Sequence, residues 1–204
     1  GYDNCSTASN HAFDQGAAGI DATLAEFDAQ GLTQSGMART KAEIAPRLLN
    51  VNGVLVAHLA YTYGYNGEPT PNGEWWRSAK LNPERIITDA RTAREMGAQV
   101  VILSLHWGSE PLAEVTHGQR LWAEEITKSG LVDLIVGHHS HMVQPIEQVN
   151  GVWTVFGMGN SLSDHPTRDK YPPATQDGVV ITVGMEISAD GHVTVEPPVV
   201  HPTW

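Results

Sequence analysis

The sequence predicts an α/β fold with a mixed sheet, and three observations support this prediction. Apolar runs alternate with helix-patterned stretches along the chain, as they do in layered α/β proteins. Two successive strand–helix–strand units imply parallel strands joined by right-handed crossovers. Three Asn-Gly or Asp-Gly pairs between apolar runs predict antiparallel hairpins, because both positions tolerate positive φ. These pairs are Asn52-Gly53, Asn150-Gly151 and Asp190-Gly191. We therefore expect a mixed sheet, or a two-sheet sandwich, with helices outside.

Three stretches have the pattern of helices: residues 16–31, 82–98 and 118–130. In the first stretch Ile20, Leu24 and Phe27 recur at helical spacing, so we expect one apolar face. In the second stretch Asn82 is a candidate N-cap, and Pro83 occupies the first helical position, where its missing N–H does no harm.

Strands are expected over residues 47–62, 99–110, 132–141, 145–157 and 178–197. The hairpin signals in the last two stretches predict an antiparallel C-terminal third. Residues 63–78 are rich in Gly, Pro, Asn and Trp, which predicts a long exposed loop. Loops of this length are often functional.

Size and charge limit the classes of function. The chain has 204 residues, 41% of them hydrophobic, which fits a single domain over residues 1–204 with one sizeable core. Its formal net charge of −11 argues against nucleic acid as a partner, because an acidic surface repels a polyanion. Cys5 is the only cysteine, which excludes an intrachain disulfide and thiolate zinc clusters.

Three polar clusters follow predicted strands, where ligands of open α/β sheets gather. They are Asn10-His11, His106 with Glu110, and His138 with His139 and His141. In an extended segment His139 and His141 would point to one side and His138 away. An H-x-H pair can offer two imidazoles to a metal, although exposed or merely hydrogen-bonded histidines are the alternative. The other two clusters favour the metal interpretation.

Each remaining candidate also has a plain structural interpretation. Asn10 would serve equally as the N-cap of the following helix, with Asp14 completing the first turn. Glu110, followed by a proline, would serve as a solvated loop acid. Asn160 lies in GMGNSLSD (157–164), where glycines let the backbone approach a ligand; there it either presents an amide to the site or forms an ordinary Gly-Asn turn.

Five motifs in order carry a resemblance to a known family: ASNHAFDQG, VNGVLVAHLAYT, VVILSLHWGSE, DLIVGHHSHMVQPIE and VFGMGNSLSD. Over about residues 1–165 the chain resembles the CapA/PgsA-like capsule biosynthesis proteins, which are associated with poly-γ-glutamate and belong to the calcineurin-like metallophosphoesterase superfamily. Ser9 is a departure, since the family pattern has a second asparagine before Asn10.

The resemblance implies a four-layer α/β/β/α sandwich of mixed sheets with a two-metal centre, holding Mn, Fe or Zn. It implies that Asn10 binds a metal through its side-chain oxygen and that His106 and His139 bind the same metal. It assigns His141 to the other metal and His11 to catalysis, as an acid or charge stabiliser. The remaining candidates are Asp14, which would orient His11, Glu110 as a catalytic residue and Asn160 as a substrate-binding residue.

The family's first strand and a second acidic motif supply the rest of the two-metal site, and neither is found before Gly1. We therefore expect an N-terminally truncated piece of the domain, or an incomplete site, with one metal or none in this chain. The resemblance also implies a bacterial, extracytoplasmic protein of the cell envelope, anchored by a segment outside these residues.

Three functions follow from these features. The first is a metal-dependent hydrolase in capsule synthesis, acting on a phosphate ester or a γ-glutamyl substrate. The second is a non-catalytic scaffold or export component with a vestigial metal site, working with other capsule synthesis membrane proteins. The third, an unrelated metal-binding α/β domain, leaves the five motifs unexplained.

Overall fold

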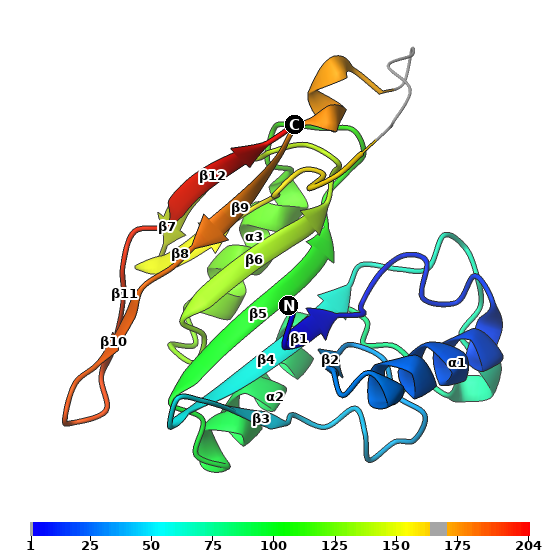
Figure 1. Ribbon diagram of the computed structural model, residues 1–204, viewed down its shortest axis with the longest axis horizontal. Coiled ribbons are helices and arrows are strands. Elements are labelled where there is room, and N and C mark those ends of the chain that lie inside the picture. The colour runs from blue at the N-terminus through cyan, green and yellow to red at the C-terminus, as the bar shows by residue number, and fades with distance from the viewer. Residues whose placement is uncertain (1, 164–170) are drawn as a thin grey trace.

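A six-stranded mixed sheet forms the centre of the computed structural model, which describes residues 2–163 and 171–204 (Figure 1). The strand order is β3-β4-β5-β6-β8-β7. The strands are β3 (Leu48–Val51), β4 (Val54–Thr62), β5 (Val100–Trp107), β6 (Leu134–His139), β7 (Ile146–Val149) and β8 (Val152–Val155). β4, β5, β6 and β8 are parallel, and the edge strands β3 and β7 pair antiparallel with their neighbours. The predicted mixed α/β architecture is confirmed.

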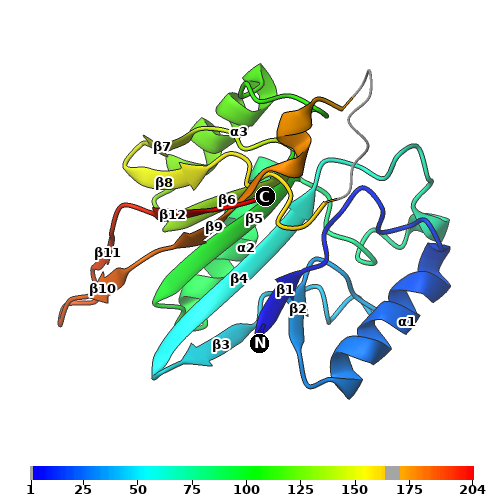
Figure 2. The same ribbon diagram turned by 45° about the horizontal axis from the view of Figure 1, so that its top comes forward.

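Two helices, α2 (Pro83–Glu95) and α3 (His117–Thr127), connect the parallel strands and lie together behind the sheet (Figure 2). Alternate strand residues point toward them and form the main core, including Leu59, Leu103 and Ile135. The predicted cap is confirmed, since the side chain of Asn82 accepts a hydrogen bond from the Arg85 N–H at 2.8 Å.

A smaller unit beside the sheet carries the N-terminal motif. β1 (Asn4–Ser6) and β2 (Thr33–Ser35) form a parallel pair, and α1 (Gly16–Ala29) lies next to it, apart from α2 and α3 (Figure 1). Ile20 and Leu24 are buried as predicted, whereas Phe27 is only half-buried. This unit has a second small core, formed by Ala12, Phe13, Ile20, Leu24, Met37 and Tyr65.

The C-terminal strands lie on the opposite side of the sheet from α2 and α3 (Figure 2). β9 (Gly178–Thr182) pairs antiparallel with β12 (Val199–Thr203), and β10 (Met185–Ile187) pairs with β11 (Val193–Val195) across the Asp190-Gly191 turn. The prediction of a wholly antiparallel C-terminal third is wrong in one place, because β8 runs parallel to β6. Two short 3₁₀ helices, η1 (Pro71–Gly73) and η2 (Pro173–Gln176), lie in the connections.

The described residues build a helical layer, the main sheet and part of a second sheet. Apolar side chains from β9 and β10 face the valine-rich surface of the main sheet across a cavity of about 490 Å³. No helix in the described ranges is long and apolar enough to span a membrane.

Candidate functional site

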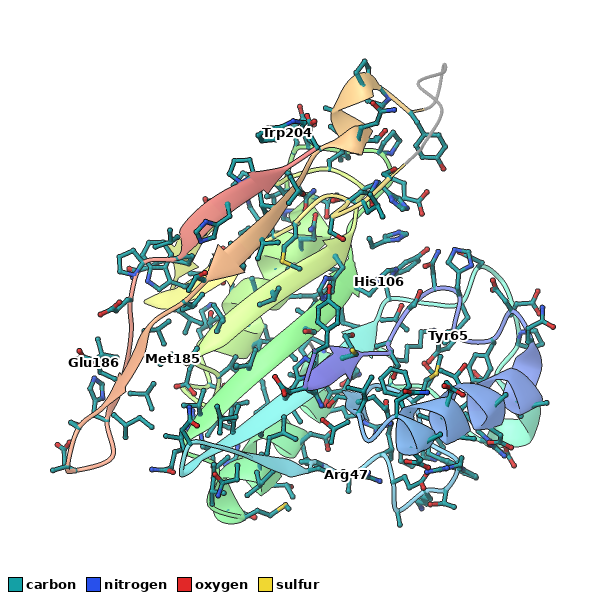
Figure 3. The ribbon with its side chains drawn as sticks, viewed as in Figure 1. Arg47, Tyr65, His106, Met185, Glu186 and Trp204 are labelled. Carbon is teal, nitrogen blue, oxygen red and sulfur yellow. The ribbon has the colours of Figure 1, made fainter. Side chains whose placement is uncertain are left out.

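The three polar clusters predicted from the sequence meet at one end of the main sheet. His106 is near the end of β5 and His139 ends β6, while Asn10 follows β1. Figure 3 shows His106 at this end of the sheet, next to the segments that lead to α1. Four residues of the three clusters, Asn10, His11, Glu110 and His139, line a cavity of about 630 Å³ together with Tyr63, Asn66, Gly108, Ser109 and Tyr171.

Asn10 and His106 form a direct contact although they are far apart in the sequence. His106 Nε2 donates to Asn10 Oδ1 at 2.9 Å, and Asn10 is buried. The interpretation of Asn10 as a helix cap is wrong, because α1 starts at Gly16 with Gln15 at the N-cap position. Neighbouring ligands about 2.1 Å from one ion lie about 3.0 Å apart in octahedral geometry and about 3.4 Å apart in tetrahedral geometry, so this oxygen and nitrogen are spaced as an octahedral pair would be once the imidazole proton is on Nδ1.

His139 and His141 meet for a reason that the sequence pattern did not reveal. Their φ values are +96° and +55°, so the segment is not extended, and the prediction that alternation places them on one side is wrong in its reasoning. The left-handed backbone directs both rings toward Glu110. His139 Nδ1 lies 3.4 Å from Glu110 Oε1, and His141 Nε2 lies 3.9 Å from the same oxygen.

Glu110 is not the solvated loop acid of the alternative interpretation. Its side chain is 21% exposed, and it contacts both histidines. The Tyr171 hydroxyl also donates to Glu110 Oε2 at 3.3 Å.

Burial keeps the imidazoles of His106 and His139 neutral. It lowers the pKa of His106 to about 3, with the neighbouring His139 and His138 adding smaller effects. Burial also lowers the pKa of His139, and the carboxylate of Glu110 opposes this shift only in part. Neutral imidazoles keep a lone pair for a metal at pH 7.

His138 is set apart from the pair, as predicted. Its ring lies beside His106, with 6.5 Å between the ring centroids. Its Nε2 atom is buried and has no hydrogen-bond partner in the described part of the chain. Burial lowers the pKa of His138 to about 4.

Asn160 and Asp14 each hold a histidine of the site. His141 Nδ1 donates to Asn160 Oδ1 at 3.0 Å, and Asn160 Nδ2 donates to the Thr175 carbonyl at 2.7 Å. With the proton on Nδ1, Nε2 is the unprotonated nitrogen of the neutral His141 ring. Asn160 is therefore more than an ordinary turn residue, and its predicted contact with substrate stays a prediction. Asp14 lies before α1 rather than in its first turn, and its Oδ2 is 2.7 Å from His11 Nδ1.

Sequence reasoning missed three residues of the site. Tyr63 lies against His139 with 4.6 Å between the ring centroids, and Asn66 accepts a hydrogen bond from Asn10. Tyr171 contacts Glu110 from the C-terminal part of the chain. The composition of residues 63–78 marked that loop as functional, but nothing in the pattern singled out these side chains.

The donors fit a divalent metal in chemistry but not in number. Imidazole nitrogens and an amide oxygen are suitable ligands for Mn, Fe or Zn. Within residues 2–163 and 171–204, however, no group of three or more His, Cys, Asp or Glu side chains is arranged to hold a metal ion. The described residues thus offer only part of a ligand set.

Comparison with solved structures shows the fold. A putative 5'-nucleotidase from Staphylococcus aureus has a TM-score of 0.61 at 15% identity, over 100% of this chain and 38% of that one. The calcineurin-like phosphoesterase YfkN from Bacillus subtilis has a TM-score of 0.60 at 18% identity, over 99% of this chain and 63% of that one. The architecture is therefore of the metallophosphoesterase type.

Comparison with protein sequences shows the family. The PGA biosynthesis protein CapA of Bacillus subtilis is 30% identical over 202 residues, which are 96% of this chain and 50% of the relative. The capsule biosynthesis protein CapA of Bacillus anthracis is 28% identical over 80% of this chain and 41% of its own length. The chain thus spans about half the length of the curated relatives it matches. The family model described as bacterial capsule synthesis protein PGA_cap matches residues 1–165, and the chain belongs to this family.

Proposed function

We propose that this chain carries part of the metal centre of a hydrolase that acts in the synthesis of a bacterial poly-γ-glutamate capsule. The main support is the geometry at this end of the sheet: Asn10, Glu110 and His139 line one cavity, His106 contacts Asn10 at 2.9 Å, and His141 lies 3.9 Å from Glu110. Burial keeps His106 and His139 neutral, and Asn160 fixes the tautomer of His141. The relatives' names supply the capsule context. The protein would be extracytoplasmic, anchored by a segment outside these residues, and would work with other capsule synthesis membrane proteins.

In this proposal Asn10, His106 and His139 hold one divalent metal and His141 holds a second. Carboxylates outside the described residues complete the set. The metals, Mn, Fe or Zn, would supply a Lewis acid and lower the pKa of water. The substrate is a phosphate ester or a γ-glutamyl compound.

His11 is the proposed acid of the reaction. Water adds its oxygen to phosphorus or to the acyl carbon and gives up a proton to solvent, and the bond to the leaving group breaks. The Nε2–H of His11 supplies the proton that the leaving group needs, and His11 regains a proton from solvent. Asp14 accepts from His11 Nδ1 at 2.7 Å and so directs the other ring nitrogen for this transfer.

The metal content of the full-length protein tests the proposal. Protein purified without chelator should hold Mn, Fe or Zn, and His139→Ala with His141→Ala should remove both the metal and phosphodiesterase activity on a chromogenic ester. His192→Ala, an exposed histidine far from the site in sequence, is the matched control and should change neither. Metal-free wild-type protein would rule out the enzyme.

The 204 residues alone should bind metal weakly, or bind one ion only, because the described residues bring no group of three or more His, Cys, Asp or Glu side chains together around one ion. Equilibrium dialysis against Mn²⁺ measures this, and two tightly held ions would contradict it.

A second candidate is the scaffold without turnover. The partial ligand set of the described residues favours it. Full-length protein that holds its metals but hydrolyses neither phosphate esters nor γ-glutamyl compounds would support this candidate over the hydrolase.

A further inference from the structure

Asn66 lies in the loop between β4 and α2, and its backbone conformation is one that favours asparagine or glycine. It forms a tight turn with Gly67, closed by a hydrogen bond from the Glu68 N–H to the Tyr65 carbonyl at 2.9 Å. The φ values are +55° at Asn66 and +87° at Gly67, a region that asparagine and glycine enter at low cost. The turn alone would therefore be satisfied by either residue.

The side chain of Asn66 makes a contact that the turn does not need. Asn10 Nδ2 donates to Asn66 Oδ1 at 3.1 Å. An amide has its oxygen and its NH₂ group on opposite sides, so holding the NH₂ group fixes where the oxygen points. With Nδ2 of Asn10 bound to Asn66, Oδ1 of Asn10 faces His106 Nε2 at 2.9 Å.

The loop is attached to both segments that carry these two residues. The ring of Tyr65 is buried against Phe13, with 4.7 Å between the centroids, and its hydroxyl donates to the Ser78 carbonyl at 2.8 Å. The Tyr63 N–H donates to the His106 carbonyl at 2.9 Å. Figure 3 shows Tyr65 on the side of α1, with His106 at the end of the sheet. Asn66 is thus held in a fixed position relative to Asn10 and His106.

We propose that Asn66 is a positioning residue, which orients the amide of Asn10 so that its oxygen faces a divalent metal beside His106. The inference rests on the metal centre of the proposed function and adds to it a residue from the loop. Residues that orient ligands in this way change metal affinity by about 10- to 100-fold when they are replaced.

Titration of the full-length, metal-depleted protein with Co²⁺ tests this role, with the visible absorption of bound Co²⁺ as the readout. Asn66→Gly keeps the left-handed turn and removes the acceptor, so Co²⁺ affinity should fall about tenfold or more. Asn66→Asp keeps an acceptor oxygen and should restore the affinity to within about threefold of wild type. Asn52→Gly is the matched control at a second exposed left-handed position, φ +52°, and should bind Co²⁺ as wild type does.

The possible outcomes distinguish failure of this inference from failure of the proposed metal centre. Equal Co²⁺ affinity of wild type and Asn66→Gly would show that Asn66 serves only the turn, and would overturn the inference alone. If wild-type protein gives no Co²⁺ spectrum, or one that survives His106→Ala, the proposed metal centre fails and the inference fails with it. Loss in Asn66→Gly with recovery in Asn66→Asp supports both.

Discussion

Three half-buried histidines have pKa values far below that of a free imidazole. Burial is the main cause in each, and it lowers the pKa to about 4 for His58, about 3 for His106 and about 4 for His138. In the unfolded chain a histidine has a pKa near 6.5. As the pH falls from about 6.5 to 4, these histidines therefore bind protons in the unfolded chain while they stay neutral in the folded chain. The fold should be most stable above this window and lose stability within it.

Replacing His58 should reduce this acid sensitivity. His58 Nε2 bonds to Ser104 Oγ at 2.8 Å, away from the proposed ligands, so His58→Gln removes one titrating group without touching the metal centre. Between pH 7 and pH 5 the variant should lose about 2 kcal/mol less unfolding free energy than wild type. Urea unfolding at several pH values measures the slope of the unfolding free energy against pH. His192→Gln, at an exposed position, should keep the wild-type slope. An unchanged slope in His58→Gln would contradict the claim that His58 is held neutral in the fold.

The tautomer of His141 should depend on Asn160. Because Asn160 Oδ1 accepts from His141 Nδ1, wild-type protein at pH 8 should show the proton on Nδ1 by ¹⁵N NMR of the imidazole. Asn160→Ala removes the acceptor and should return His141 to the mixture of tautomers found in free histidine. Asn160→Asp keeps an acceptor and should keep the proton on Nδ1. The same tautomer in all three proteins would mean that Asn160 does not orient His141.

At the scale of single residues, the ligand candidates were predictable and the residues that hold them were not. His106 and His139 lie near the ends of predicted neighbouring strands, so their convergence follows from the parallel topology. Asn10 follows β1 of a separate strand pair, and His141 is directed by its positive φ, so neither position follows from that topology. The role of Asn66 depends on a contact across 56 positions in the sequence, and the orientation of His141 depends on one across 19. Contacts of this kind leave no local pattern.

The glycine before the histidine run is required by the packing of β6. A Cβ atom at Gly137 would collide with the Phe156 carbonyl and the indole nitrogen of Trp107. These two groups are themselves joined by a hydrogen bond of 2.9 Å, in which the indole is the donor. Any side chain at position 137 would push apart the strands that deliver the histidines.

Gly137→Ala should therefore lower the free energy of unfolding by about 3 kcal/mol. Gly118→Ala is the matched control in α3, where nothing lies within 4 Å of the added atom. It should raise stability by about 0.5–1 kcal/mol, because alanine favours the helix. Guanidinium unfolding compares the two variants, and a Gly137→Ala protein as stable as wild type would show that the strands can move apart easily.

At the scale of elements, local signals located the helices and the hairpins. The cap at Asn82 and the turns at Asn52-Gly53 and Asn150-Gly151 depend on nearby residues only, and each was predicted. The place of β8 beside β6 depends on pairing between distant segments, which a hairpin signal does not report. The C-terminal third was therefore predicted less well.

At the scale of the whole molecule, net charge should limit binding of the polymer. With a net charge of −11, the chain repels a polyanion such as poly-γ-glutamate except where a cation intervenes. In light-scattering or pull-down measurements at low salt, full-length protein in EDTA should not bind the polymer, whereas Mn²⁺ should permit binding. His139→Ala with His141→Ala should abolish the effect of Mn²⁺. Binding in EDTA would point instead to a basic surface.

The single domain over residues 1–204 that the length and composition suggest stays a prediction.

The backbone at His141 inverts the usual ranking of alanine and glycine. At φ +55° a residue with a Cβ atom carries a strain of about 1 kcal/mol, which glycine escapes. His141→Gly should therefore be more stable than His141→Ala by about that amount, as a comparison of melting curves would show. If only the fold were under selection, glycine or asparagine would be favoured at positions 139 and 141. A relative that carries those residues in the GHHSH run would be recognisable, from sequence alone, as one that has kept the fold and given up the metal.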